Sequence, residues 1–483
     1  MYKQLQPTWF SNTRSDILSG ITVALALIPE AIAFSIIAGV DPMVGLYASI
    51  CIAIVIAFAG GRPGMISAAT GAMALLMVTL VKDHGVEYLF AATLLTGVIQ
   101  YVLGILKLGR LVTFIPQSVI IGFVNALAIL IFMAQLVHFE GQGWLMYALV
   151  ALTLAIIYLL PLVSKVIPSA LAAIIVVSIL TISLGLDVRT VGDMGQLSNL
   201  PPLFHIPQVL WTLETLWIIF PYSLSLAFVG ILESLLTATI VDEMTDTGSD
   251  KNREIKGQGL ANIVTGFFGG MAGCAMIGQS VINVKSGGRT RLSTLTAGVF
   301  LLILLLLLGN VVTRIPMAAL VGVMFMVSIG TFDWQSLRKL NRVPRPDAVV
   351  MIVTVSIVVA THNLSYGVFA GIVLSAVIFA WRMARIRAVE HVTADGKKYV
   401  VSGQLFFGTM THFVGLFRYQ EDPQHVVVDF AHSHVWDQSA VTAIAKMIAK
   451  YEQLGKRVTV EGLNEESRQI IDRIGLGTTS GGH

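Results

Sequence analysis

The fold of this chain is decided by the stretch Gly60-Gly-Arg-Pro-Gly-Met-Ile-Ser-Ala-Ala-Thr-Gly-Ala-Met73. A second stretch of the same kind reads Gly269-Gly-Met-Ala-Gly-Cys-Ala-Met-Ile-Gly-Gln-Ser280. Both interrupt apolar sequence with small residues, and both are too short to be an ordinary membrane-spanning helix of about 20 apolar residues. The pair therefore indicates two broken segments in one membrane protein.

A glutamate in apolar sequence precedes each broken segment. Glu30 precedes Thr70 by 40 residues, Glu233 precedes Gly273 by the same 40, and both pairs are related by an offset of 203 residues. Two unlike features that recur at one offset predict duplicated halves, and about seven spans in each half would make the halves inverted. A carboxylate at membrane depth is expected to face a cavity, to have a partner or to hold a proton. A glutamate near a helix end that reaches the interface is the alternative.

Broken segments at matching places in two halves indicate a transporter binding site near the middle of the membrane. Two half-helices that begin there would present backbone N–H groups and positive dipole ends to the gap, and these attract an anion. Glycine and alanine let the backbone approach a ligand closely. Helix contact through small residues is the alternative for either segment alone.

The composition is that of a membrane protein. Of 483 residues, 55% are hydrophobic and 12% are charged, about half of the usual charged share, and the mean hydropathy is +0.80. Apolar runs predict about fourteen spans. Their centres lie near residues 27, 50, 73, 97, 125, 154, 176, 227, 264, 280, 301, 325, 354 and 375. Cys51 and Cys274 lie in apolar sequence and suggest neither a disulfide nor a metal site.

The basic residues predict the orientation of the chain. With a cytoplasmic N-terminus, three basic residues lie in outward loops and fourteen in inward loops, which is a positive-inside bias. The outward ones are Lys82, Arg189 and Arg314. The inward ones are Arg62, Lys107, Arg110, Lys165, Lys251, Arg253, Lys256, Lys285, Arg289, Arg291, Arg338, Lys339, Arg342 and Arg345. We therefore expect a multi-pass protein of the cell (inner) membrane with both termini in the cytoplasm, and basic inward loops at 251–260 and 285–291.

After residue 387 the composition becomes that of a soluble domain. Residues 399–407, 425–430 and 457–461 read as strands, and residues 440–453 and 465–474 read as helices. Such alternation predicts a small α/β layer structure. We divide the chain into a transmembrane domain at 1–387, a cytoplasmic domain at 388–478 and a flexible tail at 479–483.

These residues make the chain resemble the SulP anion transporters, the family of the animal sulfate/chloride/bicarbonate exchangers and the motor protein prestin. The motifs that carry the resemblance are Pro29-Glu-Ala-Ile-Ala-Phe34, Gly45-Leu-Tyr47, the segment from Ile66 to Met73, the span around Glu233, and Asn283-Val-Lys-Ser-Gly-Gly-Arg-Thr290. The C-terminal part is similar to a STAS domain, including Asp437-Gln-Ser439. The resemblance implies seven-plus-seven inverted repeats divided into a core and a gate, a homodimer, and elevator-like movement of the core.

The resemblance also implies which residues bind the transported ions. In the family, the anion lies between the third and tenth spans and is touched by the first and eighth. The matching residues of this chain are Glu30, Phe34, Thr70, Gly71, Ala275, Met276 and Ile277, with Thr70 at the position of a bicarbonate-binding threonine and Met276 and Ile277 at backbone-donor positions. Glu233 and Thr237 match an aspartate and a threonine that hold sodium in a cyanobacterial relative, so Na⁺ there is the one metal site to consider.

Two departures from the family pattern concern coupling. Several animal members carry an arginine at the start of the tenth span, where this chain has Gly278. Helix dipoles and a co-transported cation must then compensate the anion. Glutamate stands at position 233 in place of aspartate, as in proton-coupled members, and a partly desolvated glutamate can take up a proton.

In the STAS-like part, Ser439 corresponds to a serine that is phosphorylated in soluble anti-sigma-factor antagonists, so it is a candidate regulatory residue. The interpretation we prefer is an N-terminal cap of the following helix.

Together these features predict a cation-coupled symporter of a small oxyanion, with H⁺ preferred over Na⁺ and sulfate as the family default. Na⁺-coupled bicarbonate transport, dicarboxylate/H⁺ symport (for example of fumarate) and anion exchange are the alternatives. A nucleobase transporter shares the fold, but it would not account for the STAS-like domain. No nucleophile–base or metal-ligand constellation suggests an enzyme. No cofactor and no nucleic-acid partner is expected, and the expected partners are the anion, the coupling ion, the bilayer and a second copy of the chain.

Overall fold

The computed structural model describes residues 9–107, 109, 115–163, 168–194, 200–393 and 396–475. The chain divides into two compact units, residues 1–372 and 373–483, and each is described by itself. The predicted tail at 479–483 and the basic residues Arg110 and Lys165 lie outside the described residues.

Each of the predicted span centres falls within a helix, so a helix is confirmed at every predicted centre. The helices of the first half are α2 Thr13–Ala38, α3 Pro42–Ala59, α4 Gly71–His84, α5 Val86–Ile105, α6 Gln117–Leu136, α7 Trp144–Val163 and α8 Ser169–Ser183. Those of the second half are α9 Leu213–Thr245, α10 Lys251–Phe267, α11 Ile277–Lys285, α12 Arg291–Val312, α13 Met317–Thr331, α15 Arg345–Thr361 and α16 Leu364–Met383. The short α14 Trp334–Arg338 and the 3₁₀ turns η2 Val137–Phe139 and η3 Val191–Asp193 were not predicted.

Within the described residues, seven helices are long and apolar enough to cross a membrane, judged by length and composition. They are α2, α3, α5, α6 with its following turn, α7, α9 and α16. Helices α4 and α11 are shorter, with 14 and 9 residues, because each begins in the middle of a broken segment.

The two broken segments meet as a two-stranded sheet, which the sequence did not predict. Strand β1 Ser67–Ala69 precedes α4, and strand β2 Gly273–Ala275 precedes α11. The strands are antiparallel, so the helices that follow them begin at opposite ends of the sheet, as inverted halves require. The paired residues are Ser67 with Ala275, Ala68 with Cys274 and Ala69 with Gly273.

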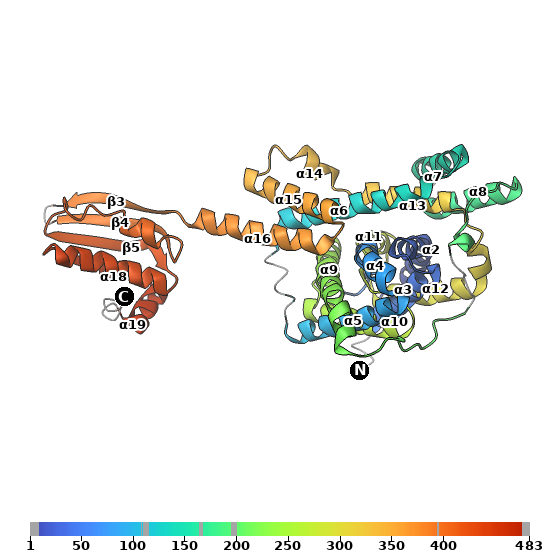
Figure 1. Cartoon of the computed structure of the whole chain (residues 1–483), viewed down its shortest axis with the longest axis horizontal. Helices are drawn as coiled ribbons and strands as arrows, with labels where there is room; N and C mark the ends of the chain where they lie inside the picture. Colours follow the sequence, from blue (N-terminus) through green and yellow to red (C-terminus); the bar gives the residue numbers. More distant parts are fainter. Residues whose placement is uncertain are drawn as a thin grey trace. The chain divides into compact units, whose positions relative to one another are not determined.

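The helices of this unit pack in two groups. We call α2, α3, α4, α5, α9, α10, α11 and α12 the core group, and α6, α7, α8, α13 and α15 the gate group, because helices pack mainly within each set. Figure 1 shows the gate group along the upper edge of the unit and the core group beneath it. Contacts of α13 with α2 and of α6 with α4 join the groups.

The prediction of a basic loop at 251–260 is wrong, because α10 begins at Lys251. Asp250 caps this helix by accepting a hydrogen bond from the Arg253 amide at 2.9 Å. The glycines that suggested a loop mark a close helix crossing instead. A Cβ atom on Gly259 would lie 2.5 Å from the amide nitrogen of Tyr101 in α5, so only glycine allows this approach.

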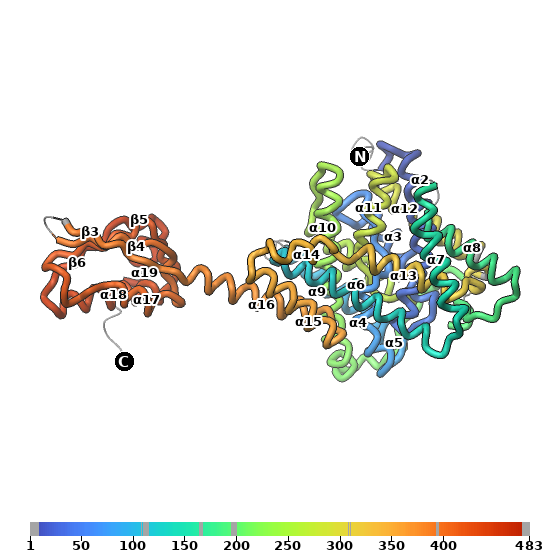
Figure 2. Tube along the Cα trace, turned by 90° about the horizontal axis from the view of Figure 1, so that it is seen from above, coloured from blue at the N-terminus to red at the C-terminus, as the bar shows by residue number. Residues whose placement is uncertain are grey.

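The second unit contains a four-stranded sheet in the order β3-β4-β5-β6, with β3 antiparallel and the other neighbours parallel. Its strands are β3 Ile386–Thr393, β4 Gly396–Leu405, β5 His425–Val435 and β6 Arg457–Glu461, and its helices are α17 Met410–Val414, α18 Gln438–Gln453 and α19 Glu465–Ile474. Helix α18 packs along one face of the sheet (Figure 2). The predicted strands and helices are confirmed, whereas β3 and α17 were not predicted. Strand β3 lies at a sheet edge and exposes Val389 and Val392, so it lacks the alternating apolar pattern of a half-buried strand.

Candidate anion-binding site

The strand pair is held by buried side chains of the core group. Asn262 of α10 accepts a hydrogen bond from the Gly273 amide at 2.9 Å and donates to the Gly273 carbonyl at 3.1 Å. Asn262 also donates to Gln100 Oε1 of α5 at 2.8 Å. A Cβ atom on Gly273 would collide with the carbonyl oxygen of Ala68, so the paired strands β1 and β2, which we call the ladder, require glycine at this position.

Two helices begin at this ladder without a side-chain cap. Thr70 is the N-cap residue of α4 and Met276 that of α11, and neither side chain accepts a hydrogen bond from its helix. The first amides of a helix have no intrahelical acceptor, so the amides of residues 71–73 and 277–279 are free to bind an anion. Met276 differs from the expectation, because its own amide donates to the Ile66 carbonyl at 2.9 Å. Its N–H extends the ladder, and the first donor that α11 offers is Ile277.

Helix α2 lines these helix starts with Glu30 and Phe34, one turn apart. Glu30 Oε1 accepts a hydrogen bond from Gln279 Nε2, in the first turn of α11, at 2.8 Å. A Cβ atom on Gly71 would lie 2.9 Å from Phe34 Cε1 and 3.0 Å from Ile131 Cδ1 of α6. The start of α4 is therefore covered by one side chain from the core group and one from the gate group.

Helix α9 brings Glu233 to the other side of the ladder. The Cys274 thiol donates to Glu233 Oε2 at 2.6 Å, and its sulfur lies 3.2 Å from Thr70 Oγ1. Thr237 Oγ1 donates to the backbone carbonyl of Glu233 at 2.7 Å, so its hydroxyl proton is used within the helix. Gly230, one turn earlier, lies close to α4, because a Cβ atom there would contact the end of the flexible Met73 side chain.

The structure thus brings together the predicted residues of the membrane unit around one ladder. Glu30, Phe34, Thr70, Gly71 and Ile277 lie at the two helix starts. Ala275 lies within β2, where its amide donates to Ser234 Oγ at 3.1 Å. Sequence reasoning missed the side chains that connect these residues, which are Gln100, Asn262, Cys274 and Gln279. Cys274 and Gln279 stand inside the second broken segment, and their polar atoms among small residues were a usable signal.

Ser439 lies in the second unit, and its interpretation as a cap is wrong. The N-cap of α18 is Asp437, whose side chain accepts a hydrogen bond from the Ala440 amide at 2.8 Å. Ser439 is the second residue of the helix and is half-buried. The Asp437 carboxylate accepts the hydrogen bond at the helix start, so the Ser439 hydroxyl has no capping role.

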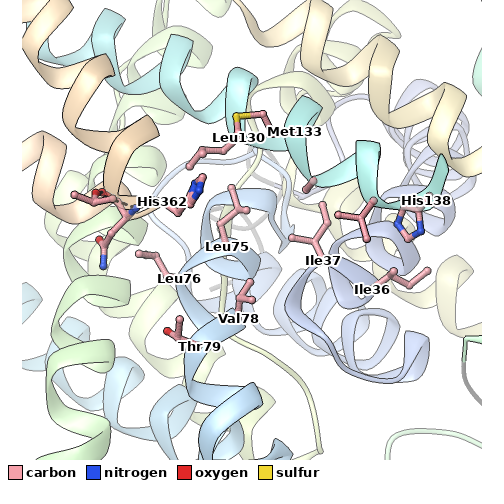
Figure 3. Close-up of a pocket in the computed structure, with 14 residues that line it drawn as sticks. Ile36, Ile37, Leu75, Leu76, Val78, Thr79, Leu130, Met133, His138 and His362 are labelled. Carbon is pink, nitrogen blue, oxygen red and sulfur yellow. Dashed lines mark hydrogen bonds between the residues drawn. The ribbon is translucent and has the colours of Figure 1, made fainter. Parts of the chain in front are cut away.

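A cavity of about 620 Å³ lies at the boundary between the core group and the gate group. Figure 3 shows Leu75 of α4 below Leu130 of α6, and Ile36 of α2 close to His138. The lining of the cavity on α4 begins one turn beyond Gly71. The space therefore separates two groups of helices close to the start of α4.

Comparison with known proteins identifies the family. The family model described as the sulfate permease family matches residues 13–147 and 143–354, and the model of the STAS domain matches residues 386–479. YbaR of Bacillus subtilis, a protein named for sulfate transport, is 60% identical over 473 residues, which cover 97% of this chain and 98% of that protein. The bicarbonate transporter BicA of Picosynechococcus sp. is 26% identical over 524 residues, which cover 97% of this chain and 92% of BicA.

Solved structures agree with this assignment. The transmembrane domain of a cyanobacterial bicarbonate transporter BicA superimposes with a TM-score of 0.68 at 29% identity and covers 75% of this chain and 98% of that one. The murine anion transporter Slc26a9 has a TM-score of 0.84 at 16% identity and covers 96% of this chain and 88% of that one, which shows the fold alone. The expected transmembrane fold with a C-terminal STAS domain is therefore confirmed. The chain belongs to the sulfate permease family of multi-pass membrane transporters.

Proposed function

We propose that this protein is a secondary active symporter that moves a small oxyanion together with a cation, with sulfate as the first candidate substrate and H⁺ as the coupling ion. The observation that carries the proposal is that two uncapped helix starts lie next to a buried carboxylate and that hydrogen bonds link this carboxylate to the start of α4. Thr70 stands at the start of α4, and Cys274 joins it to Glu233. Sulfate is placed first because the relative that is 60% identical is named for its transport.

The charge at the helix starts supports an anion that needs a partner cation. Each helix N-terminus carries about half a positive charge, so two of them supply about one, which is less than the charge of sulfate. Gly278 adds none, and a Cβ atom there would meet nothing within 4 Å, so the start of α11 borders open space. A proton or metal cation at Glu233 would supply the remaining compensation.

The contacts of Glu233 favour H⁺ over Na⁺. A thiol is a soft group and suits a hard cation poorly, whereas carboxylate, hydroxyl and carbonyl oxygens suit it well. The thiol of Cys274 occupies one carboxylate oxygen, which leaves the other oxygen of Glu233 and the lone pairs of Thr237 as Na⁺ ligands. Na⁺-coupled transport of bicarbonate, as suggested by the likeness to BicA, therefore remains the second candidate, and H⁺-coupled dicarboxylate transport and anion exchange follow it.

Movement of the core group past the gate group is the proposed transport step. Ile131 of α6 lies over Gly71, so sliding of α2 and α4 against α6 would remove this side chain from the start of α4. The cavity at this boundary supports such a movement. We further propose a homodimer in the cell (inner) membrane with both termini in the cytoplasm, a membrane domain at 1–387, a STAS domain at 388–478, and Ser439 as a regulatory site.

Uptake into proteoliposomes tests the proposal. Labelled sulfate, bicarbonate and fumarate are offered separately under an imposed H⁺ gradient, an imposed Na⁺ gradient, or neither. We expect sulfate uptake that an inward H⁺ gradient accelerates and a Na⁺ gradient leaves unchanged. Acceleration by Na⁺ alone would reassign the coupling ion. Uptake that requires a second anion inside the vesicle, with no effect of either gradient, would replace symport by exchange.

A further inference from the structure

The buried thiol of Cys274 connects the two functional ends of the proposed site. It donates to Glu233 Oε2 at 2.6 Å, and it lies 3.2 Å from Thr70 Oγ1. Thr70 is 5% exposed and Glu233 is 8% exposed, whereas Cys274 is fully buried between them. Cys274 therefore contacts both the carboxylate and the hydroxyl at a place that water does not reach.

The direction of these hydrogen bonds depends on the state of Glu233. With an empty, ionised carboxylate, the single thiol proton is donated to Glu233, as the structure has it. The Thr70 hydroxyl can then contact the sulfur only as the donor, because the thiol has one proton. Its proton points away from the helix starts, and its oxygen lone pairs repel an anion there.

A cation on Glu233 reverses the donor and acceptor roles in these hydrogen bonds. A proton turns the carboxyl group into a donor toward the sulfur, and Na⁺ would take up the carboxylate lone pairs. In either case the thiol proton is released and can turn toward Thr70 Oγ1, since this bond has no fixed donor. The Thr70 hydroxyl then donates its proton to an oxygen of the bound anion. Only rotation of an S–H and an O–H bond is required, and no heavy atom has to move.

We propose that Cys274 is a positioning residue that conveys cation loading at Glu233 to the anion donor Thr70. The inference rests on the proposed symport and goes beyond it, because it assigns the coupling step to one side chain. It explains why Thr70, an N-cap residue, does not cap α4 with its hydroxyl.

Two other buried carboxylates of the core group, Glu254 and Glu30, have different partners. Among the described residues, the side chains that act on the Glu233 carboxylate are Cys274 and Thr70. Glu254 of α10 accepts from the amides of Gly61 and Arg62, and Glu30 of α2 accepts from Gln279. The remaining charged or titratable groups on α9 and on the elements packed against it are Lys82, Asp83, His84, Glu87, Tyr88, Tyr101, Glu214, Tyr222, Asp242, Glu243, Lys251, Arg253, Lys256 and Lys285.

The test measures how strongly cation loading changes anion affinity. Full-length protein in lipid nanodiscs binds labelled sulfate at pH 6 and pH 8 without Na⁺, and at pH 8 with and without Na⁺. In the wild type we expect affinity to rise on the order of tenfold beyond charge compensation with the coupling cation, the effect of one hydrogen bond to a charged group. Cys274→Val keeps the volume and removes both contacts, so the ratio is expected to fall about tenfold, to the part that charge compensation at Glu233 supplies by itself. Cys274→Ser offers a hydroxyl that can donate and accept, so it is expected to restore most of the ratio.

The outcomes separate this inference from the proposed function. Cys51→Val replaces the other buried cysteine, in α3, and is the matched control that should keep the wild-type ratio. If Cys274→Val is not monodisperse, Cys274→Ala takes its place. A cation effect of wild-type size in Cys274→Val or Cys274→Ala overturns the role of Cys274 and leaves symport intact. If neither cation changes the sulfate affinity or the sulfate uptake of the wild type, both the proposed symport and this inference are overturned.

Discussion

The two membrane carboxylates occupy matching places in the two halves, yet they have different neighbours. Glu30 accepts a hydrogen bond from the amide of Gln279, which would have to turn its whole amide group to become the acceptor. Glu233 accepts from the thiol of Cys274, a group that can both donate and accept and that reaches Thr70. Corresponding positions in the two halves therefore have different partners, and only the partner of Glu233 also reaches Thr70, which is why we propose coupling at Glu233.

The largest effect is expected from disruption of the ladder, the strand pair that lies between the two carboxylates. Gly273→Val should abolish sulfate binding and destabilise the membrane unit by about 3 kcal/mol or more, because the new side chain collides with the Ala68 carbonyl. Thermal unfolding and sulfate binding of the purified protein measure both effects. Gly278→Ala is the matched control, because a Cβ atom there meets nothing within 4 Å. Equal behaviour of the two variants would contradict the assignment of the ladder.

Exchange of one carboxylate at a time tests the comparison directly. Glu233→Gln should remove the acceleration of uptake by the cation gradient and leave part of the anion binding, because the amide cannot load a cation. Glu30→Gln should keep the gradient dependence, because Gln279 can still donate to the amide oxygen. Gradient-driven uptake in proteoliposomes is the measurement. The distinction between the two carboxylates fails if Glu233→Gln stays gradient-dependent or if Glu30→Gln loses this dependence.

Loss of the Thr70 hydroxyl should have a smaller effect. Thr70→Val keeps the shape of the side chain and removes one donor to the anion, so sulfate is expected to bind with about 1.5–3 kcal/mol less free energy, or about tenfold to a hundredfold more weakly. Equilibrium binding in nanodiscs measures the change. Thr79→Val, further along α4 in the lining of the cavity, is the matched control. Unchanged affinity in Thr70→Val would move the anion away from the start of α4.

The smallest effect on transport is expected from a buried carboxylate of the STAS unit. Asp422 accepts hydrogen bonds from Lys397 at 2.7 Å, Tyr399 at 2.9 Å and Tyr451 at 2.6 Å. Burial tends to raise the pKa of Asp422, but the hydrogen bonds from Lys397, Tyr451 and Tyr399 outweigh it and hold this pKa below its ordinary value of 3.8. A depressed pKa means that the ionised form stabilises the fold above the ordinary value and that this contribution is lost as pH falls through the lower, folded-state pKa.

Hydrogen exchange of peptides from the STAS unit in the full-length protein checks this expectation. Protection should be constant from neutral pH down to about pH 4 and should fall below that value. Asp422→Asn should weaken protection by about 1.5–3 kcal/mol at neutral pH, because Lys397, Tyr399 and Tyr451 lose a charged hydrogen-bond acceptor and Lys397 keeps only the ion pair with Glu390 at 2.8 Å. Sulfate binding by the membrane unit should stay unchanged. Asp472→Asn on α19 is the exposed control, and equal loss in both variants would contradict the role of the buried pair.

Much of the fold could be predicted from local patterns. The apolar runs placed every expected span centre within a helix, and the 203-residue offset related α2 to α9 and α4 to α11. The start of α10 was missed because Gly257 and Gly259 look like loop residues until a neighbouring helix is present. Strand β3 was missed because it lies at a sheet edge and exposes Val389 and Val392, so it lacks the alternating apolar pattern of a half-buried strand.

The candidate site was predictable only in part. Glu30, Glu233 and Thr70 stand out because their chemistry is unusual for apolar or broken segments. Cys274 and Gln279 are recognisable as polar residues within a broken segment, but their roles follow only from the atoms that they contact. Those contacts join residues 41 and 249 positions apart, and no local pattern encodes them.

The sequence by itself determined that the chain crosses a membrane many times, that its halves correspond, and which positions combine charge or small size with an apolar surrounding. These properties depend on the transfer of each segment from water to lipid and on neighbours along the chain. The tertiary structure alone decided that the two broken segments pair as strands, that the Met276 amide is used by the ladder, and that Glu233 faces a thiol while Glu30 faces an amide. The physical reason is that hydrogen bonds are directional and short, so they are settled by which backbones approach one another and not by composition.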